Sequence, residues 1–162
     1  MSVETFSEML TATSASRLIR ETDWIVPAVQ SVHILAICVV VGSALMLDLR
    51  LMRLIGRGES VSAYTRRYSP WLSVAVLVLF LSGVILIVGE PSRTLLNWVF
   101  WTKMALLSAG IGVTALVLLP AARERAYWDG TSRYITATFL GMASLAIWAS
   151  VIVCGRWIAY TL

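Results

Sequence analysis

The chain has 162 residues, of which 59% are hydrophobic and only 14% are charged, and its mean hydropathy is +0.82. These values exclude an ordinary soluble globular domain. The net charge of +4 comes from 13 Lys and Arg residues against 9 Asp and Glu residues, and no basic run alternates with aromatic residues, so we expect no nucleic-acid partner.

The N-terminal segment predicts an amphipathic helix over residues 3–20. Ser2 is a residue type that caps helices, and apolar residues recur at helical spacing in Phe6, Met9, Leu10 and Thr13. The segment has several acidic residues, no basic start and no compact apolar centre, so we do not expect a cleaved signal peptide. We expect the helix to lie in the membrane interface.

Four long apolar runs follow, over residues 25–47, 72–89, 98–119 and 135–154. A helix of about 20 residues, rising ~1.5 Å per residue, crosses a hydrocarbon core of ~30 Å. None of the runs has the charged face of a soluble helix. The sequence therefore predicts an all-α fold, a transmembrane four-helix bundle, with residues 1–162 forming a single transmembrane domain.

Prolines and turn residues suggest where the spans end. Pro70 is expected to start the second span, and Pro120 to end or kink the third. Asp129 and Gly130 predict a turn before the fourth. Asp48 ends the first span, and we expect its carboxylate to pair with Arg66 or Arg67 across the first hairpin.

Each span carries a stripe of residues at three-four spacing that should face the other helices. On the fourth span the stripe consists of small or weakly polar residues around one tryptophan: Gly141, Ser144, Trp148, Val151 and Gly155. Small residues allow close helix approach, which matters because lipid provides no hydrophobic drive for helix association. Ser108 and Gly112 form a second small pair on another face of the third span.

The distribution of basic residues predicts the orientation. Eight of the 13 Lys and Arg residues lie in the connections between spans one and two and between spans three and four. The positive-inside rule places these connections in the cytoplasm and both termini outside. Aromatic residues form two expected interfacial belts, one of Trp24, Trp98, Trp101, Trp157 and Tyr160, the other of Tyr68, Trp71, Tyr127, Trp128 and Tyr134.

Two ionisable residues lie inside the predicted spans at comparable depth in the outer part of the membrane, His33 and Lys103. Ionisable groups in a span usually face the protein interior or a ligand. Other readings stay open: Lys103 could extend its ammonium to the interface, and His33 could be a neutral imidazole bonded to a neighbour. The candidate ligand-binding set is completed by Gln30, Glu90, Asn97, Trp148 and Arg156, with Glu90 also able to pair with Arg156 or Lys103.

Several of these motifs together resemble those of a known group of proteins. They are Trp24-Ile25-Val26-Pro27, Gln30-Ser31-Val32-His33, Gly42-Ser43, Asp48-Leu49-Arg50, Glu90-Pro91, Asn97 with Phe100 and Lys103, and Gly155-Arg156. Over nearly the whole chain the sequence resembles an uncharacterised family of short bacterial four-span membrane proteins, a domain of unknown function. The resemblance implies a multi-pass protein of the bacterial inner membrane. A fainter likeness to the copper-resistance D type of membrane bundle assigns no function.

Three functions compete. The favoured one is a non-catalytic membrane protein or complex subunit, self-associating or held in a larger complex, with a small-ligand site in the outer polar cluster. The first alternative is a haem b redox subunit with His33 as axial ligand and Lys103 or Arg156 pairing with the propionates. The second is a copper or other soft-metal site that uses His33 with cysteine or methionine. No motif of a known soluble-enzyme site appears, so we expect no enzyme.

Overall fold

The computed structural model describes residues 2–158, 160 and 161, and in this part of the chain all regular structure is helical. Four helices are long and apolar enough to cross a membrane. The elements are α1 (Val3–Thr11), α2 (Ser14–Glu21), α3 (Ile25–Leu51), α4 (Val61–Gly89), α5 (Pro91–Leu95), α6 (Trp98–Arg123), the 3₁₀ helix η1 (Thr131–Arg133) and α7 (Tyr134–Trp157). The predicted all-α fold with four apolar helices is confirmed, and the chain is a multi-pass membrane protein.

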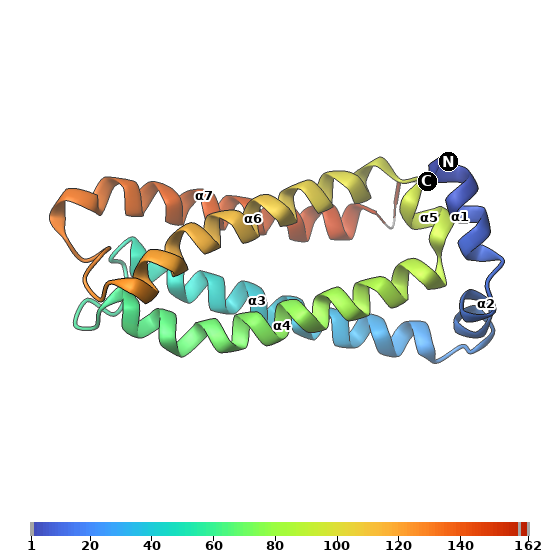
Figure 1. The fold of residues 1–162 in the computed structure, drawn as a ribbon, viewed down its shortest axis with the longest axis horizontal. Coiled ribbons are helices and arrows are strands. Elements are labelled where there is room, and N and C mark those ends of the chain that lie inside the picture. The colour runs from blue at the N-terminus through green and yellow to red at the C-terminus, as the bar shows by residue number, and fades with distance from the viewer. Residues whose placement is uncertain (1, 159, 162) are drawn as a thin grey trace.

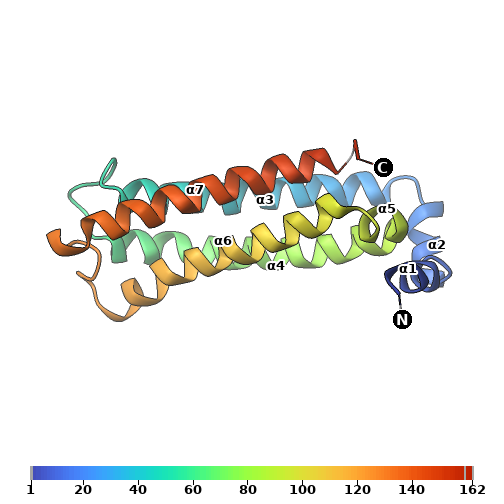
Figure 2. The same cartoon turned by 90° about the horizontal axis from the view of Figure 1, so that it is seen from above.

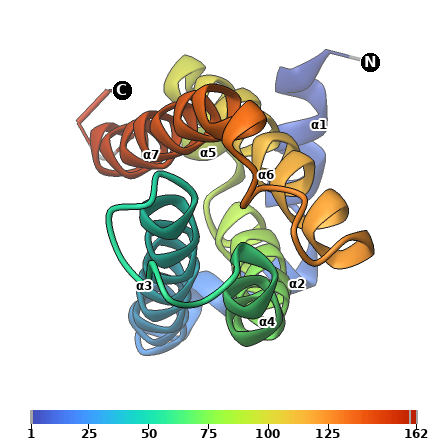
Figure 3. The same ribbon diagram turned by 90° about the vertical axis from the view of Figure 1, so that its left-hand side faces the viewer.

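The four long helices form two antiparallel hairpins, α3 with α4 and α6 with α7 (Figure 1). Seen along the bundle, α7 lies beside α3 and α6 beside α4 (Figure 3). We call the end with the α3–α4 and α6–α7 connections the loop end, and the end with α1, α2 and α5 the terminal end. Figure 2 shows α1 and α2 gathered at the terminal end.

All four long helices extend beyond the predicted apolar runs, and Pro70 and Pro120 lie inside two of them. α4 begins at Val61, where the Ser60 hydroxyl accepts a hydrogen bond from Ala63 N at 3.1 Å. Pro70 lies within α4, so the expectation that it starts this helix was wrong. α6 continues past Pro120 to Arg123, so Pro120 does not end the helix, and the alternative of a kink there stays a prediction. Prolines are tolerated in membrane helices because neighbouring groups satisfy the freed backbone carbonyls.

The N-terminal segment is helical, but as two helices rather than one. The Ser2 hydroxyl caps α1 by accepting from Thr5 N, as predicted. The Thr13 hydroxyl accepts from Ser16 N and begins α2, which breaks the expected 3–20 helix. Side-chain caps of this kind compete with helix continuation. Phe6 and Met9 of α1 are exposed, so the apolar face is free to contact lipid.

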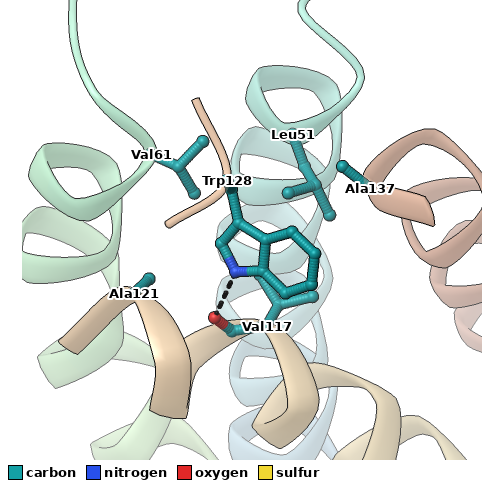
Figure 4. Packing of buried hydrophobic residues seen from close by; sticks show 6 residues of the cluster. All are labelled: Leu51, Val61, Val117, Ala121, Trp128 and Ala137. Carbon is teal, nitrogen blue, oxygen red and sulfur yellow. Dashed lines mark hydrogen bonds between the residues drawn. The ribbon is translucent and has the colours of Figure 1, made fainter. Parts of the chain in front are cut away.

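Two apolar clusters form the core. The loop-end cluster contains Leu51, Val61, Val117, Ala121, Trp128 and Ala137 (Figure 4). The central cluster contains Val40, Ala44, Leu72, Ala75 and Trp148. Trp128 was expected in an interfacial belt, but its ring is buried and its indole N–H donates to Val117 O at 3.0 Å (Figure 4). The ring can be buried at the loop end because this hydrogen bond satisfies its N–H group.

An ion pair joins the two hairpins at the loop end. Arg50 is buried, and its guanidinium lies 2.8 Å from Asp129 Oδ1 and donates to Glu59 O at 2.7 Å. The expected pairing of Asp48 with Arg66 or Arg67 was wrong: Arg67 pairs with Glu59 at the surface, and Asp48 is buried. Asp48 lies on the inner face of α3, out of reach of both arginines, which are exposed.

α3 and α7 lie close together at Gly141. A Cβ atom at this position would lie 2.9 Å from Met52 Cγ and 3.2 Å from the backbone oxygen of Asp48. The backbone atom cannot move away as a side chain can. The predicted stripe on the fourth span therefore faces the bundle as far as Val151, whereas Gly155 is exposed.

Gly141→Ala is expected to lower the thermal midpoint of the detergent-solubilised protein, because the added methyl group pushes α3 and α7 apart. Gly112→Ala is the matched control, since nothing lies within 4 Å of the Cβ position at Gly112. It should leave the midpoint unchanged or raise it slightly, since Ala favours helix over Gly by about 1 kcal/mol. Equal effects of the two changes would contradict the close approach at Gly141.

Asp129→Ala should destabilise the protein, because it leaves the buried Arg50 guanidinium without its counter-charge. Breaking a buried pair costs ~3–5 kcal/mol, and we expect the lower part of this range because Asp129 is partly exposed. Arg67→Ala breaks the exposed Arg67–Glu59 pair and should cost ~1 kcal/mol or less. Thermal unfolding followed by circular dichroism measures both, and a larger loss for Arg67→Ala would refute this ranking.

Candidate functional site

His33 and Ser82 form a hydrogen bond between α3 and α4. His33 Nδ1 lies 2.7 Å from Ser82 Oγ, and the Ser82 hydroxyl donates to Val78 O at 2.6 Å. Because the hydroxyl proton is used toward Val78, the Ser82 oxygen accepts from a proton on Nδ1. In the neutral ring this leaves Nε2 unprotonated, as an acceptor or a ligand.

Lys103 enters the same region from α6. Its Cε and Nζ atoms would each lie 3.6 Å from a Cβ placed on Gly155 of α7, so its stem runs along α7. Both side chains are half-buried. His33 on α3 and Lys103 on α6 therefore both lie toward the terminal end of the bundle.

This pair lies in the terminal-end half of the bundle. Exposed tryptophans mark the same end at the start of α3, the start of α6 and the end of α7, in Trp24, Trp98, Trp101 and Trp157. Lys103 lies five residues into α6, about 7.5 Å along the helix from Trp98. Tryptophans favour the headgroup level of a bilayer, which places the pair just inside that level.

Gln30, Trp148 and Arg156 do not join the pair. Gln30 is exposed one turn before His33. Trp148 is buried in the central cluster, against Gly110 of α6. Arg156 is exposed, and its guanidinium lies over the ring of Tyr160, 5.0 Å from its centre. None of the three therefore lines a common site with His33.

Glu90 and Asn97 have structural roles at the terminal end. Glu90 pairs with Arg93, at 3.2 Å, so the expected pairing with Arg156 or Lys103 was wrong. The Asn97 side chain caps α6 by accepting from Val99 N at 2.9 Å. Its amide nitrogen donates to Thr161 O at 2.6 Å, which ties the C-terminal residues to the start of α6. Asn97 is buried and fully engaged by these contacts.

The described residues contain no group of three or more His, Cys, Asp or Glu side chains able to hold a metal ion. Cys38 is exposed on α3, and Cys154 is half-buried on α7. Cys38 lies on a different face of α3 from His33. The geometry therefore gives no support to the predicted copper or soft-metal site.

A shallow groove of about 690 Å³ lies at the opposite, loop end. It is lined mainly by Arg50, Arg53, Arg57, Glu59, Asp129 and Tyr134. Its charges are engaged with the protein: Arg50 pairs with Asp129, and Arg53 donates to the carbonyl oxygens of Asp129 and Gly130. We treat the groove as part of the connection between hairpins, since these contacts explain its residues.

A family model described as a family of unknown function, DUF6644, matches residues 16–161. The chain belongs to DUF6644. The comparisons with curated proteins and with solved structures gave no match. Membership in DUF6644 agrees with the resemblance seen in the sequence and with the four apolar helices. It assigns no activity, so the function has to be argued from the His33–Lys103 pair itself.

The hydrogen bond to Ser82 predicts one tautomer of His33. In protein labelled with ¹⁵N at histidine, the neutral ring should show a protonated Nδ1 and an unprotonated Nε2 by NMR. His33 is the only histidine of the chain, so its signals need no further assignment. Ser82→Ala removes the acceptor and should shift the population toward the Nε2–H form. A wild-type ring protonated at Nε2 would contradict the arrangement.

Proposed function

We propose that this DUF6644 protein is a non-catalytic membrane protein that binds an anionic ligand with a neighbouring hydroxyl group, and that the ligand is the headgroup of an anionic lipid such as phosphatidylglycerol. The site is formed by Lys103 and His33 between the two hairpins. The observation that carries the proposal is the position of the Lys103 ammonium inside a span, without a carboxylate partner among the described residues.

The charge of Lys103 supports an anion. A cation inside a span is costly and is usually compensated by a partner or reaches the interface. Among the described residues no carboxylate pairs with Lys103, and a neutral His33 imidazole is no counter-charge. A phosphate at the headgroup level is the anion that a bilayer supplies at this depth.

His33 supports a hydroxyl beside that anion. With Nδ1–H donated to Ser82, the ring offers the lone pair of Nε2, which repels a bare anion but accepts from a hydroxyl. A phosphatidylglycerol headgroup carries both a phosphate and hydroxyl groups. Gly83 leaves room beside the ring, since a Cβ there would lie no closer than 3.7 Å to His33 Cε1.

The surroundings of the site support an inner-membrane protein with both termini outside the cytoplasm. The arginines of the α3–α4 and α6–α7 connections gather at the loop end, which the positive-inside rule assigns to the cytoplasm. The lipid site would then lie in the outer leaflet. Ser108 and Gly112 are exposed on α6 and offer a small-residue face for self-association or for a larger complex.

Lipid binding can be measured by native mass spectrometry of the protein released from nanodiscs that contain phosphatidylglycerol and phosphatidylethanolamine. Lys103→Met should reduce retained phosphatidylglycerol about tenfold, as expected for the loss of one charge-assisted contact worth ~1.4 kcal/mol. Arg93→Gln is the control, because it removes a cation at the same end outside the spans. His33→Phe should weaken binding of phosphatidylglycerol more than of phosphatidic acid, whose headgroup lacks the glycerol hydroxyls.

Retention of phosphatidylglycerol by Lys103→Met at the wild-type level would reject the lipid site. Binding of inorganic phosphate in lipid-free detergent, with the same dependence on Lys103, would identify a soluble anion instead. The comparison between the two probes therefore separates a lipid headgroup from a free anion.

One observation favours haem b as a second candidate. A histidine that ligates iron through Nε2 commonly donates its Nδ1–H to a fixed acceptor, and Ser82 provides that acceptor for His33. Lys103 would then pair with a propionate. Protein expressed with a haem supply should show a Soret absorption band that His33→Ala removes; a wild-type spectrum without this band eliminates the candidate.

A further inference from the structure

Asp48 is an acidic residue buried inside the bundle without a basic partner. Only 4% of its surface is exposed, and its Oδ2 atom has no hydrogen-bond partner among the described residues. It lies on α3 one turn before the helix ends at Leu51. An isolated ionised carboxylate in such surroundings is strongly destabilising, so the carboxyl group needs compensation.

One polar side chain on the facing helix is equally unpartnered. Ser144 lies on α7 one turn from Gly141, which packs against the backbone oxygen of Asp48, and Ser144 is almost fully buried. Besides Asp48 Oδ2, seven buried side-chain atoms have no partner in the described part of the chain, and they include Ser144 Oγ, Thr114 Oγ1 and Trp148 Nε1. Buried polar atoms are rarely left unsatisfied, so each of them calls for an explanation.

Helix packing brings these atoms to one level of the bundle. Gly110 of α6 lies against Trp148 of α7, and because the two helices are antiparallel, Thr114 falls opposite Ser144 one turn away. The backbone oxygen of Asp48 lies against Gly141 of α7. Side chains on a helix lean toward its N-terminus, so the Asp48 carboxyl leans from Gly141 toward Ser144. We call Asp48, Thr114, Ser144 and Trp148 the polar layer.

The oxygen-bearing members of the polar layer lie between the two apolar clusters, while the ring of Trp148 belongs to the central cluster. On α3, Asp48 is between Ala44 of the central cluster and Leu51 of the loop-end cluster. On α7, Ser144 lies between Ala137 of the loop-end cluster and Trp148. The loop-end cluster, with the Trp128 ring among its members (Figure 4), lies on the side of the layer toward the connections. Apolar side chains therefore separate these polar groups from both ends of the bundle.

No charged side chain from the packed helices faces Asp48. On α3, Arg50 is held by Asp129 and Glu59. On α4, Arg66 and Arg67 are exposed at the surface. On α6 and α7, the ionisable residues within the helices are Lys103, Cys154 and Arg156 toward the terminal end, and Arg123 at the loop end of α6. The charge of Asp48 therefore has to be neutralised by something other than a side chain.

We infer that the polar layer binds one hard monovalent cation, H⁺ or Na⁺, which neutralises Asp48 inside the membrane. The carboxylate and two hydroxyl groups form an all-oxygen donor set, which suits a proton or an alkali ion and not a soft metal. One carboxylate matches one positive charge. The Trp148 N–H group can donate a hydrogen bond to an oxygen atom of the layer that does not contact the cation. This site is on the loop-end side of the central cluster and does not depend on the His33–Lys103 site.

The two ions are distinguished by two measurements on purified wild-type protein in detergent. If Na⁺ binds, the thermal midpoint should rise with NaCl and level off at saturation, whereas choline chloride at equal ionic strength has no such effect. If H⁺ binds, the midpoint is independent of Na⁺, and infrared spectra near neutral pH show the carbonyl band of a protonated carboxylic acid. Labelling aspartate with ¹³C at the side-chain carboxyl should shift that band.

Asp48→Asn keeps the shape of the side chain and removes its charge. It should abolish the saturable Na⁺ effect or the protonated-acid band, and the variant should be at least as stable as the wild-type protein without Na⁺. Asp23→Asn is the control, because Asp23 is exposed before α3. Ser144→Ala should weaken the apparent Na⁺ affinity, or shift the acid band because the carboxyl group loses a neighbouring hydroxyl group. The ¹³C label assigns the band to aspartate in the wild-type protein even if Asp48→Asn does not fold.

A wild-type protein with neither a saturable Na⁺ effect nor a protonated-acid band overturns the inference, because Asp48 is then ionised without a bound cation. A band or Na⁺ effect that survives in Asp48→Asn and disappears in Asp23→Asn overturns it equally. An acid carbonyl band that the ¹³C label on aspartate does not shift also overturns the inference.

Discussion

In a bilayer the hydrophobic effect does not hold helices together, so the fold depends on how closely α3 and α7 approach at Gly141. Each hairpin is joined internally by a short connection, but α3 and α7 are far apart in sequence and meet only through packing. The small residue at 141 lets the α7 backbone lie against the Asp48 carbonyl. The Arg50–Asp129 ion pair then fixes the same two hairpins at the loop end. The same contact brings the backbone of α7 against α3 beside Asp48.

The sequence predicted the features that depend on hydropathy and helical period. Four apolar runs predicted four helices, and the stripe from Gly141 to Val151 predicted the buried face of α7. The location of His33 and Lys103 in the same half of the bundle also followed from helical rise and depth. Helix ends were predicted less well, because Pro70 and Pro120 were read by rules for soluble helices. In a membrane the backbone must stay hydrogen-bonded internally, so helices continue through prolines that would end them in water.

The remaining features depend on contacts between residues that are distant in the chain. Asp129 looked like a turn residue, and nothing local indicated that it would pair with Arg50, 79 positions earlier. Trp128 belonged to an aromatic group typical of an interface, and only its hydrogen bond to Val117 O explains its burial. Asp48 was assigned a partner among the nearest arginines, whereas its helical face turns it toward Ser144.

The bundle thus places its two unusual polar groups at different depths and on opposite sides of the central cluster. Toward the terminal end, Lys103 is a cation without a carboxylate, half-buried at the level where lipid phosphates lie. Toward the loop end, Asp48 is a carboxyl without a cation, enclosed by apolar side chains. The Lys103 ammonium and the Asp48 carboxylate could neutralise each other only in contact. The central cluster, which contains Trp148 and Val40, lies between them. A chain selected for stability alone would gain by pairing them or by replacing both with apolar residues. Their separation leaves each charge to be compensated at its own site, which is why we propose an anion beside Lys103 and a cation beside Asp48.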